Sequence, residues 1–240
     1  MIKIFKGISE LSLYAARSFI EITNQSIKER GRFTAALSGG STPTRIYELL
    51  GHQYQNEVDW LRVHFFWGDE RCVPVDDPEN NYGQTKLGLL DKIAIPKENI
   101  HRIHSELEPE SASKDYAQTL KAFSEPPFAW PRFDIVFLGM GDDGHTASLF
   151  PNSPIEPDLP TLAVAANYQG RPANRVTMTP KVLNCSRNIF FLVTGKTKAV
   201  TLSRVLSDVY SPSEFPAQRI APRDGNLTWL IDEEAGSLLK

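Results

Sequence analysis

The chain has 240 residues, a formal net charge of −3 and 41% hydrophobic residues, which is an ordinary globular composition. The small negative charge argues against nucleic acid or an anionic membrane as the main partner, so an anionic ligand needs a local cluster of cations. No stretch approaches the roughly 20 apolar residues of a membrane span, and the N-terminus lacks signal-peptide features. Cys72 and Cys185 show no disulfide or CxxC pattern, so we expect a reducing, cytoplasmic location.

Helical and strand patterns alternate along the first half of the chain. Residues 9–30 repeat apolar side chains at helical spacing, with Ser9 as the expected N-cap and Gly31 as the expected C-terminal stop. Apolar runs rich in β-forming residues predict buried strands at 33–38, 61–67 and 133–138. Further helices are predicted at 44–50, 81–90 and 111–123.

The second half of the chain continues the alternation. Strands are predicted at 161–166, 175–179, 188–194 and 227–231, and a helix at about 197–206. Alternating strands and helices predict an α/β fold whose mostly parallel sheet is covered by helices on both faces. Neither a repeat nor a clear linker is apparent, so we expect one domain over residues 1–240.

The segment from Gly139 to Pro151 follows the strand predicted at 133–138 and presents one histidine, His145, among glycines and acids. Sites in α/β folds form at the carboxyl ends of strands, and histidine titrates close to neutral pH. We therefore favour His145 as a proton-transfer group. The alternative interpretation is a structural histidine in a glycine turn.

Residues 38–43 read Ser-Gly-Gly-Ser-Thr-Pro and join a predicted strand to a predicted helix. Thr42 suits the N-cap of that helix and Pro43 suits its first turn. Free backbone N–H groups and the helix dipole at such a junction favour an anion, although a plain tight turn is the alternative. The spacing matches neither a P-loop nor a dinucleotide-binding fingerprint. The candidate phosphate-binding residues are Ser38, Gly39, Gly40, Ser41 and Thr42.

Charged residues follow the strand predicted at 61–67, in the sequence Asp69-Glu70-Arg71. A carboxylate can orient a histidine or a water, and a guanidinium recognises phosphate or carboxylate geometry. Arg175 and Lys196 add cations at two other element boundaries, where each alone would more often be surface charge. Together with Arg71 they form the local positive cluster that an anionic ligand needs.

The sequence lacks a convincing set of metal ligands. His101 and His104 have no Cys or acidic partner at motif spacing, and Asp142 and Asp143 lack the regular oxygen-ligand spacing of a calcium loop. We therefore expect chemistry that needs no metal ion.

Six segments, in this order along almost the whole chain, resemble the 6-phosphogluconolactonase family. They are residues 38–43, 67–71, 78–83, 139–151, 175–177 and 195–198. The family pattern Gly-Met-Gly-x-Asp-Gly-His-Thr-Ala-Ser-Leu-Phe-Pro is quite specific, and residues 139–151 show no departure from it. The resemblance implies a Rossmann-like α/β fold, shared with glucosamine-6-phosphate deaminase and ribose-5-phosphate isomerase.

The resemblance also implies hydrolysis of 6-phospho-D-glucono-1,5-lactone in the oxidative pentose phosphate pathway, without a metal or an organic cofactor, and points to His145 as the general base. Such hydrolysis needs an activated water, donors for the developing oxyanion and a phosphate anchor. Asp69 and Asp143 are both candidates to orient the imidazole. The phosphate and oxyanion contacts stay unassigned among Arg71, Arg175 and Lys196. We expect this sugar-phosphate lactone as the small-molecule partner and a monomer or small homo-oligomer.

Two alternative functions stay open. Glucosamine-6-phosphate deaminases share the fold and the Asp-Gly-His motif. Their sequence resembles Asp-Glu-Tyr at the position where this chain has Asp69-Glu70-Arg71. They also carry a glutamate shortly after the histidine, before a proline, in the region where this chain reads Ser148-Leu149-Phe150-Pro151. A non-catalytic sugar-phosphate sensor on the same scaffold needs phosphate contacts but no base, so the intact His145 and Asp69 argue against it.

Overall fold

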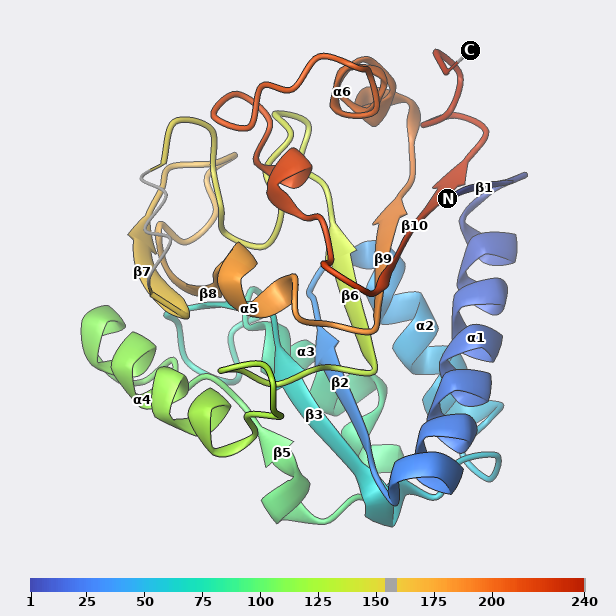
Figure 1. Cartoon of the computed structure of the whole chain (residues 1–240), viewed down its shortest axis with the longest axis vertical. Helices are drawn as coiled ribbons and strands as arrows, with labels where there is room; N and C mark the ends of the chain where they lie inside the picture. The colour runs from blue at the N-terminus through green and yellow to red at the C-terminus, as the bar shows by residue number, and fades with distance from the viewer. Residues whose placement is uncertain (154–158, 240) are drawn as a thin grey trace.

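The computed structural model describes residues 1–153 and 159–239, which build one large parallel sheet and one small antiparallel sheet (Figure 1). The large sheet has the strand order β1-β10-β9-β6-β2-β3-β5, and all neighbouring strands in it are parallel. The mostly parallel sheet predicted from the sequence is therefore confirmed. Its strands are β1 (Ile2–Phe5), β2 (Phe33–Leu37), β3 (Val63–Trp67), β5 (Ile100–His101), β6 (Ile135–Gly139), β9 (Asn188–Val193) and β10 (Asn226–Asp232).

Helices cover both faces of the large sheet. The chain crosses the sheet from β1 to β5 through one set of helices and returns to β10 through a second set, so right-handed crossovers place the sets on opposite faces. Figure 1 shows α1 and α2 on one side and α4 on the other. The first set is α1 (Ile8–Arg30), α2 (Ser41–His52) and α3 (Asn81–Gly88). The second set is α4 (Pro109–Ala122), α5 (Pro180–Leu183) and α6 (Ala199–Val205).

The small sheet is not predicted by the sequence patterns. It joins β4 (Asp69–Arg71), β8 (Asn174–Met178) and β7 (Thr161–Ala165) in the order β4-β8-β7. Periodicity identifies β7 and β8 as strands but carries no information on which sheet they enter, and the three residues of β4 read as a charged turn. Only Gly68 separates β3 from β4, so the small sheet begins at the carboxyl end of the large one.

The two ends of α1 test the capping predictions. The helix begins after Gly7, and no side chain caps it, so the prediction of Ser9 as the N-cap is wrong. Gly31 ends the helix with a positive φ of 76°, as the sequence predicts, and its N–H donates to the carbonyl of Ile27.

The strand order reverses between β2 and β6. These two strands are neighbours, but α2 carries the chain from β2 to β3 on one side, whereas the segment after β6 leads to β9 on the other. Because the two connections diverge, a crevice opens between them at the carboxyl ends of the strands. Ligand sites of open α/β sheets form at this kind of switch point.

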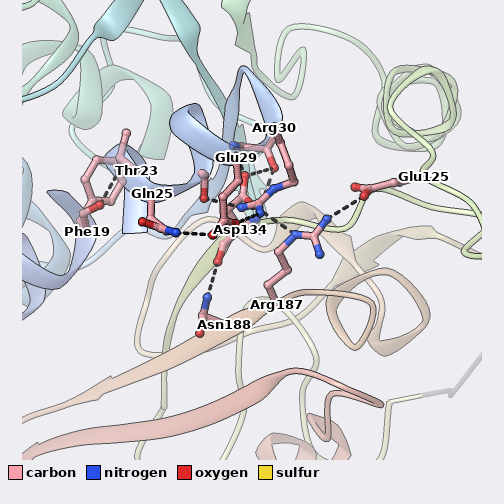
Figure 2. Close-up of polar contacts among 11 residues, drawn as sticks. Phe19, Thr23, Gln25, Glu29, Arg30, Glu125, Asp134, Arg187 and Asn188 are labelled. Atoms are coloured by element: carbon pink, nitrogen blue, oxygen red, sulfur yellow. Dashed lines mark hydrogen bonds and ion pairs between the residues drawn. The ribbon is translucent and has the colours of Figure 1, made fainter. Parts of the chain in front are cut away.

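The opposite, amino edge of the sheet is held by the buried carboxylate of Asp134, just before β6. It accepts hydrogen bonds from the backbone N–H of Thr34 and from Arg30 Nη2, both at 2.8 Å, and Arg187 Nε lies 3.2 Å from it. Figure 2 shows both arginines converging on this residue, and the Asn188 amide donating to its backbone carbonyl. Asp134 therefore ties the end of α1 to the starts of β2, β6 and β9.

Replacing this carboxylate tests how far the amino edge depends on it. We expect Asp134→Asn to lower the free energy of unfolding by about 1–3 kcal/mol, because an NH₂ group replaces an acceptor oxygen among buried donors. Urea denaturation measures the change. Asp208→Asn, at an exposed carboxylate, is the matched control and should shift the value by less than about 0.5 kcal/mol. Equal stabilities of the Asp134→Asn protein and the wild type would contradict this role.

Candidate active site

A pocket of about 230 Å³ lies at the crevice where the strand order reverses. Chain segments that are distant in the sequence contribute its walls, because parallel strands deliver their following loops to one edge of the sheet. The lining comes from residues 38–43 after β2, from Asp69, Arg71 and Asn81, from the end of β6 and the loop after it, from the β7–β8 hairpin, and from residues 192–194 and Lys198 at and beyond the end of β9.

Most residues predicted from the sequence meet in this pocket. Asp143 contacts His145 without lining the pocket, whereas Lys196 is exposed and lies outside the lining. Arg171 and Lys198 line the pocket although the sequence patterns do not single them out as candidates. The predicted residues that line it are Ser38, Gly39, Gly40, Ser41, Thr42, Asp69, Arg71, His145 and Arg175.

The turn between β2 and α2 brings the backbone to the pocket wall. A Cβ on Gly39 would lie 1.8 Å from Asn81 Oδ1, so no side chain fits at this position. Gly40 adopts a φ of 109°, which favours glycine, and α2 begins directly after it. In the described chain no side chain caps this helix, so its first-turn N–H groups and its dipole are available to an anion in the pocket.

Thr42 plays a different part from the predicted one. It lies within the first turn of α2 rather than at the N-cap, and its hydroxyl lies 3.0 Å from the hydroxyl of Thr194 at the end of β9. This contact ties α2 to the neighbouring wall of the pocket. Ser38 Oγ is buried in the lining without a hydrogen-bond partner among the described residues. An unpaired buried hydroxyl is costly, so it is an open position for a ligand atom.

His145 is oriented by Asp143. Its Nδ1 lies 2.6 Å from Asp143 Oδ1, and its backbone N–H donates to the same oxygen at 3.1 Å. The turn needs glycine at position 141, because a Cβ there would lie 2.1 Å from Nδ1. Pairing of Nδ1–H with the carboxylate leaves Nε2 as the acceptor nitrogen, and no described residue hydrogen-bonds to it.

Asp143 is well suited to hold a positive imidazole. Partial burial opposes ionisation of its carboxyl, but the hydrogen bonds and charge of His145 outweigh that effect and keep the pKa of Asp143 below its usual value. A carboxylate that is ionised at neutral pH stabilises the imidazolium that forms when the histidine takes a proton.

Aromatic rings fix the imidazole from two directions. Phe150 lies with its ring centroid 4.5 Å from that of His145, and Tyr168 approaches edge-on at 4.6 Å. The guanidinium of Arg175 lies 5.3 Å from the centre of the Phe150 ring. His145 and Arg175 therefore pack against the same side chain.

Arg175 is buried at the pocket and is not fully paired. Its Nε donates to the carbonyl of Pro172 at 3.0 Å, while its Nη2 has no partner among the described residues. Burial lowers the pKa of this guanidinium, and the nearby carboxylate of Asp69 opposes the shift. Arg71, which faces Arg175 across the small sheet, is held by Glu79 at 3.0 Å and also keeps a buried, unpaired Nε. Buried, unpaired donors of this kind predict an anionic ligand.

The two acidic residues of β4 have separate roles. Asp69 lines the pocket and accepts a hydrogen bond from Ser148 Oγ at 2.6 Å, so Asp143 and not Asp69 is the carboxylate in contact with His145. Glu70 points instead to the start of α3, where it accepts hydrogen bonds from the backbone N–H groups of Asn81 and Tyr82. The Glu70 side chain is thus part of the scaffold that presents the pocket.

A model of the family described as glucosamine-6-phosphate isomerases/6-phosphogluconolactonase matches residues 8–229. The chain belongs to this family. The resemblance found in the sequence motifs and the α/β fold expected from it are therefore confirmed.

Individual relatives are similar to this chain over most of their own length. A 6-phosphogluconolactonase of Synechocystis is 40% identical over 218 residues, which are 90% of this chain and 88% of the relative. One of Haemophilus influenzae is 40% identical over 205 residues, 85% of this chain and 86% of the relative. The solved structure of 6-phosphogluconolactonase from Trypanosoma brucei matches with a TM-score of 0.90 and 28% identity, covering 100% of this chain and 98% of that one.

Residues 1–153 and 159–239 contain no group of three or more His, Cys, Asp or Glu side chains placed to hold a metal ion. Within the same ranges, the helices are all too short or too polar to cross a membrane. His101, one of the two histidines weighed for metal binding, pairs with His64 at 3.1 Å.

Glu70 generates a pH prediction. Burial raises its pKa from 4.5 to about 7, against the opposing effect of its backbone hydrogen bonds. The folded state then holds the proton more tightly than the unfolded state, so the resulting stability is complete below about pH 4.5 and is lost as the pH rises through about 7.

The free energy of unfolding of the wild type should therefore fall by about 3 kcal/mol relative to Glu70→Gln between about pH 4 and pH 8. Denaturant titrations at several pH values measure both proteins. Glu70→Gln also weakens the hydrogen bonds at α3 at every pH. The test is therefore how the difference in unfolding free energy between the two proteins changes with pH, not its size at one pH. Parallel stability profiles would refute the assignment.

Proposed function

We propose that this chain hydrolyses 6-phospho-D-glucono-1,5-lactone to 6-phospho-D-gluconate in the oxidative pentose phosphate pathway, with His145 as the general base. Membership of the family and 40% identity to 6-phosphogluconolactonases over most of the chain support the reaction. The observation that carries the proposal is the His145–Asp143 pair, whose acceptor nitrogen is unpaired beside a pocket rich in cations.

The dyad supplies the proton transfers that hydrolysis needs. His145 Nε2 takes a proton from a water as the water oxygen attacks the lactone carbonyl, and Asp143 stabilises the imidazolium. When the tetrahedral intermediate collapses, the bond between the carbonyl carbon and the ring oxygen breaks. The imidazolium returns its proton to that oxygen, which becomes the free hydroxyl of the product acid.

The cations divide between the two ends of the substrate. We place the phosphate at the N-terminus of α2 beside Lys198, because first-turn N–H groups, the helix dipole and an ammonium meet there. We place the developing oxyanion nearer Arg175, whose unpaired Nη2 is buried and which shares the Phe150 ring with His145. Lys196, predicted from the sequence as a further cation of the site, is exposed, so we favour Lys198 over it.

The alternatives fit the site less well. Where the deaminase pattern has a glutamate before the proline, this chain has Phe150, and its ring packs on His145 instead of supplying a second acid. A sensor of sugar phosphates has no use for the His145–Asp143 pair. We also propose that the reaction takes place in the cytoplasm, because Cys72 and Cys185 are both free thiols.

The base assignment predicts a large catalytic defect. His145→Ala should lower kcat for the lactone by about 10²–10⁴-fold with little change in substrate binding, because the proton acceptor alone is lost. Asp143→Asn should lower kcat less, in the same direction. Acid release from freshly made lactone measures the rates, after subtraction of spontaneous hydrolysis. Near-normal turnover by a folded His145→Ala protein would exclude His145 as the base.

The phosphate assignment separates two neighbouring lysines. We expect Lys198→Ala to weaken binding of 6-phosphogluconate by about tenfold, because a charge-assisted contact to phosphate is removed, and to leave gluconate binding unchanged. Lys196→Ala should change binding of 6-phosphogluconate by less than twofold, because an exposed cation outside the lining gains little in water. Calorimetric titration with the two acids measures all four values. A larger loss from Lys196→Ala than from Lys198→Ala would reverse the assignment.

A further inference from the structure

Asp142 connects three loops around the pocket although it does not line the pocket itself. Its carboxylate lies 2.6 Å from the ammonium of Lys198 and accepts a hydrogen bond from Gln169 Nε2 at 3.1 Å. Its backbone N–H donates to the hydroxyl of Tyr168 at 3.4 Å, and its carbonyl accepts from the hydroxyl of Thr201. One residue of the β6 loop thus holds the β7–β8 hairpin and the start of α6.

The hairpin tip brings three side chains to the pocket lining, those of Tyr168, Gln169 and Arg171. Tyr168 and Arg171 form an isolated antiparallel bridge around a tight turn, whose central residues Gln169 and Gly170 have positive φ values of 51° and 70°. Residues 167–171 do not belong to the hydrophobic core of the described chain. Hydrogen bonds with Asp142 and the edge-on contact of Tyr168 with the imidazole hold the tip at the loop that carries His145, and Arg171 also lies 3.7 Å from Glu79.

The conformation of the Lys198 side chain also depends on Asp142. Lys198 ends a single 3₁₀ turn, Lys196–Lys198, and its long side chain has many rotamers in the absence of a partner. Lys198 lines the pocket, and the ion pair with Asp142 at 2.6 Å restricts its side chain to one rotamer.

We propose that Asp142 is a positioning residue for the phosphate end of the substrate. It keeps the Lys198 ammonium at the pocket wall and the hairpin tip over His145, so the site is formed before the ligand arrives. This inference rests on the proposed function in so far as Lys198 contacts the phosphate. Asp142 has this role because its carboxylate contacts Lys198 and Gln169, whereas that of the next residue, Asp143, contacts His145.

If Asp142 only neutralised Lys198, removing its carboxylate would have the opposite effect on phosphate binding from the effect expected of a positioning residue. A carboxylate that merely neutralised Lys198 would lower the positive potential of the pocket, and its removal would tighten phosphate binding. A carboxylate that positions Lys198 and the hairpin makes binding tighter by reducing the ordering that the ligand must cause, and its removal weakens binding.

The first test is a double-mutant cycle on binding of 6-phosphogluconate, measured by calorimetry. Asp142→Ala should weaken binding by about tenfold in the wild-type background and by less than about twofold in the Lys198→Ala background, because coupled residues are not additive. Gluconate binding should stay unchanged, and kcat should fall less than KM rises, since the His145–Asp143 contact remains. Asp208→Asn, at an exposed carboxylate, is the charge-matched control. Unchanged or tighter binding of 6-phosphogluconate by Asp142→Ala would overturn the proposal.

The second test needs no turnover and no ligand. Amide hydrogen exchange at residues 167–171 should speed up by about threefold or more in Asp142→Ala, because the hairpin tip loses the hydrogen bond from Gln169 Nε2 to the carboxylate. Exchange in β2 of this variant, and at the tip of the Asp208→Asn protein, should stay at the wild-type rate. Unchanged exchange at the tip would overturn the proposal. If Asp142→Ala fails to fold, Asp142→Asn replaces it, with a smaller effect of the same sign expected in both tests. A wild-type protein that neither binds 6-phosphogluconate nor hydrolyses the lactone would refute the proposed function, and hydrogen exchange would still decide the role of Asp142.

Discussion

The site depends on one topological constraint, the reversal of strand order between β2 and β6. Because neighbouring parallel strands send their connections in opposite directions, neither connection can close the crevice above them. Both turns therefore keep exposed backbone at the pocket, and both need glycine at the closest approach: Gly39 faces Asn81, and Gly141 faces the His145 ring. The start of α2 and His145 consequently line one pocket, although about 100 residues separate them in the sequence.

Electrostatics explains how a chain of net charge −3 serves an anionic substrate. Four cations line the pocket within the described chain, namely Arg71, Arg171, Arg175 and Lys198. Two carboxylates outside the lining limit the repulsion within the cluster: Glu79 pairs with both Arg71 and Arg171, and Asp142 pairs with Lys198. Arg71 and Arg175 still keep unpaired donor nitrogens. The pocket therefore contains buried donors that a phosphate or an oxyanion can satisfy.

Local patterns predicted the strands of the core and the pocket residues that follow them. Strands buried on both faces of a parallel sheet are apolar, and the sequence shows such apolar runs at β2, β3, β6 and β9. The residues that follow these runs could therefore be placed at strand ends, namely residues 38–43, the acids of β4 and His145. The antiparallel sheet could not be predicted, because its strands β4 and β8, in which Arg71 lies opposite Arg175, are about 100 residues apart in the sequence. For the same reason Arg171 was missed: it reaches the pocket through a hairpin whose position depends on that pairing.

The limits of sequence patterns are clearest in the two adjacent aspartates of the β6 loop. Asp142 and Asp143 are adjacent and of the same residue type. The motif makes Asp143 a candidate to orient the imidazole but gives no role to Asp142. The turn that follows decides between them: Gly144, with a φ of 84°, folds the chain back so that the His145 ring lies against Asp143. Asp142 then faces the hairpin and Lys198. One aspartate thereby contacts His145 and the other contacts the hairpin and Lys198, and the difference comes from backbone direction rather than from chemistry.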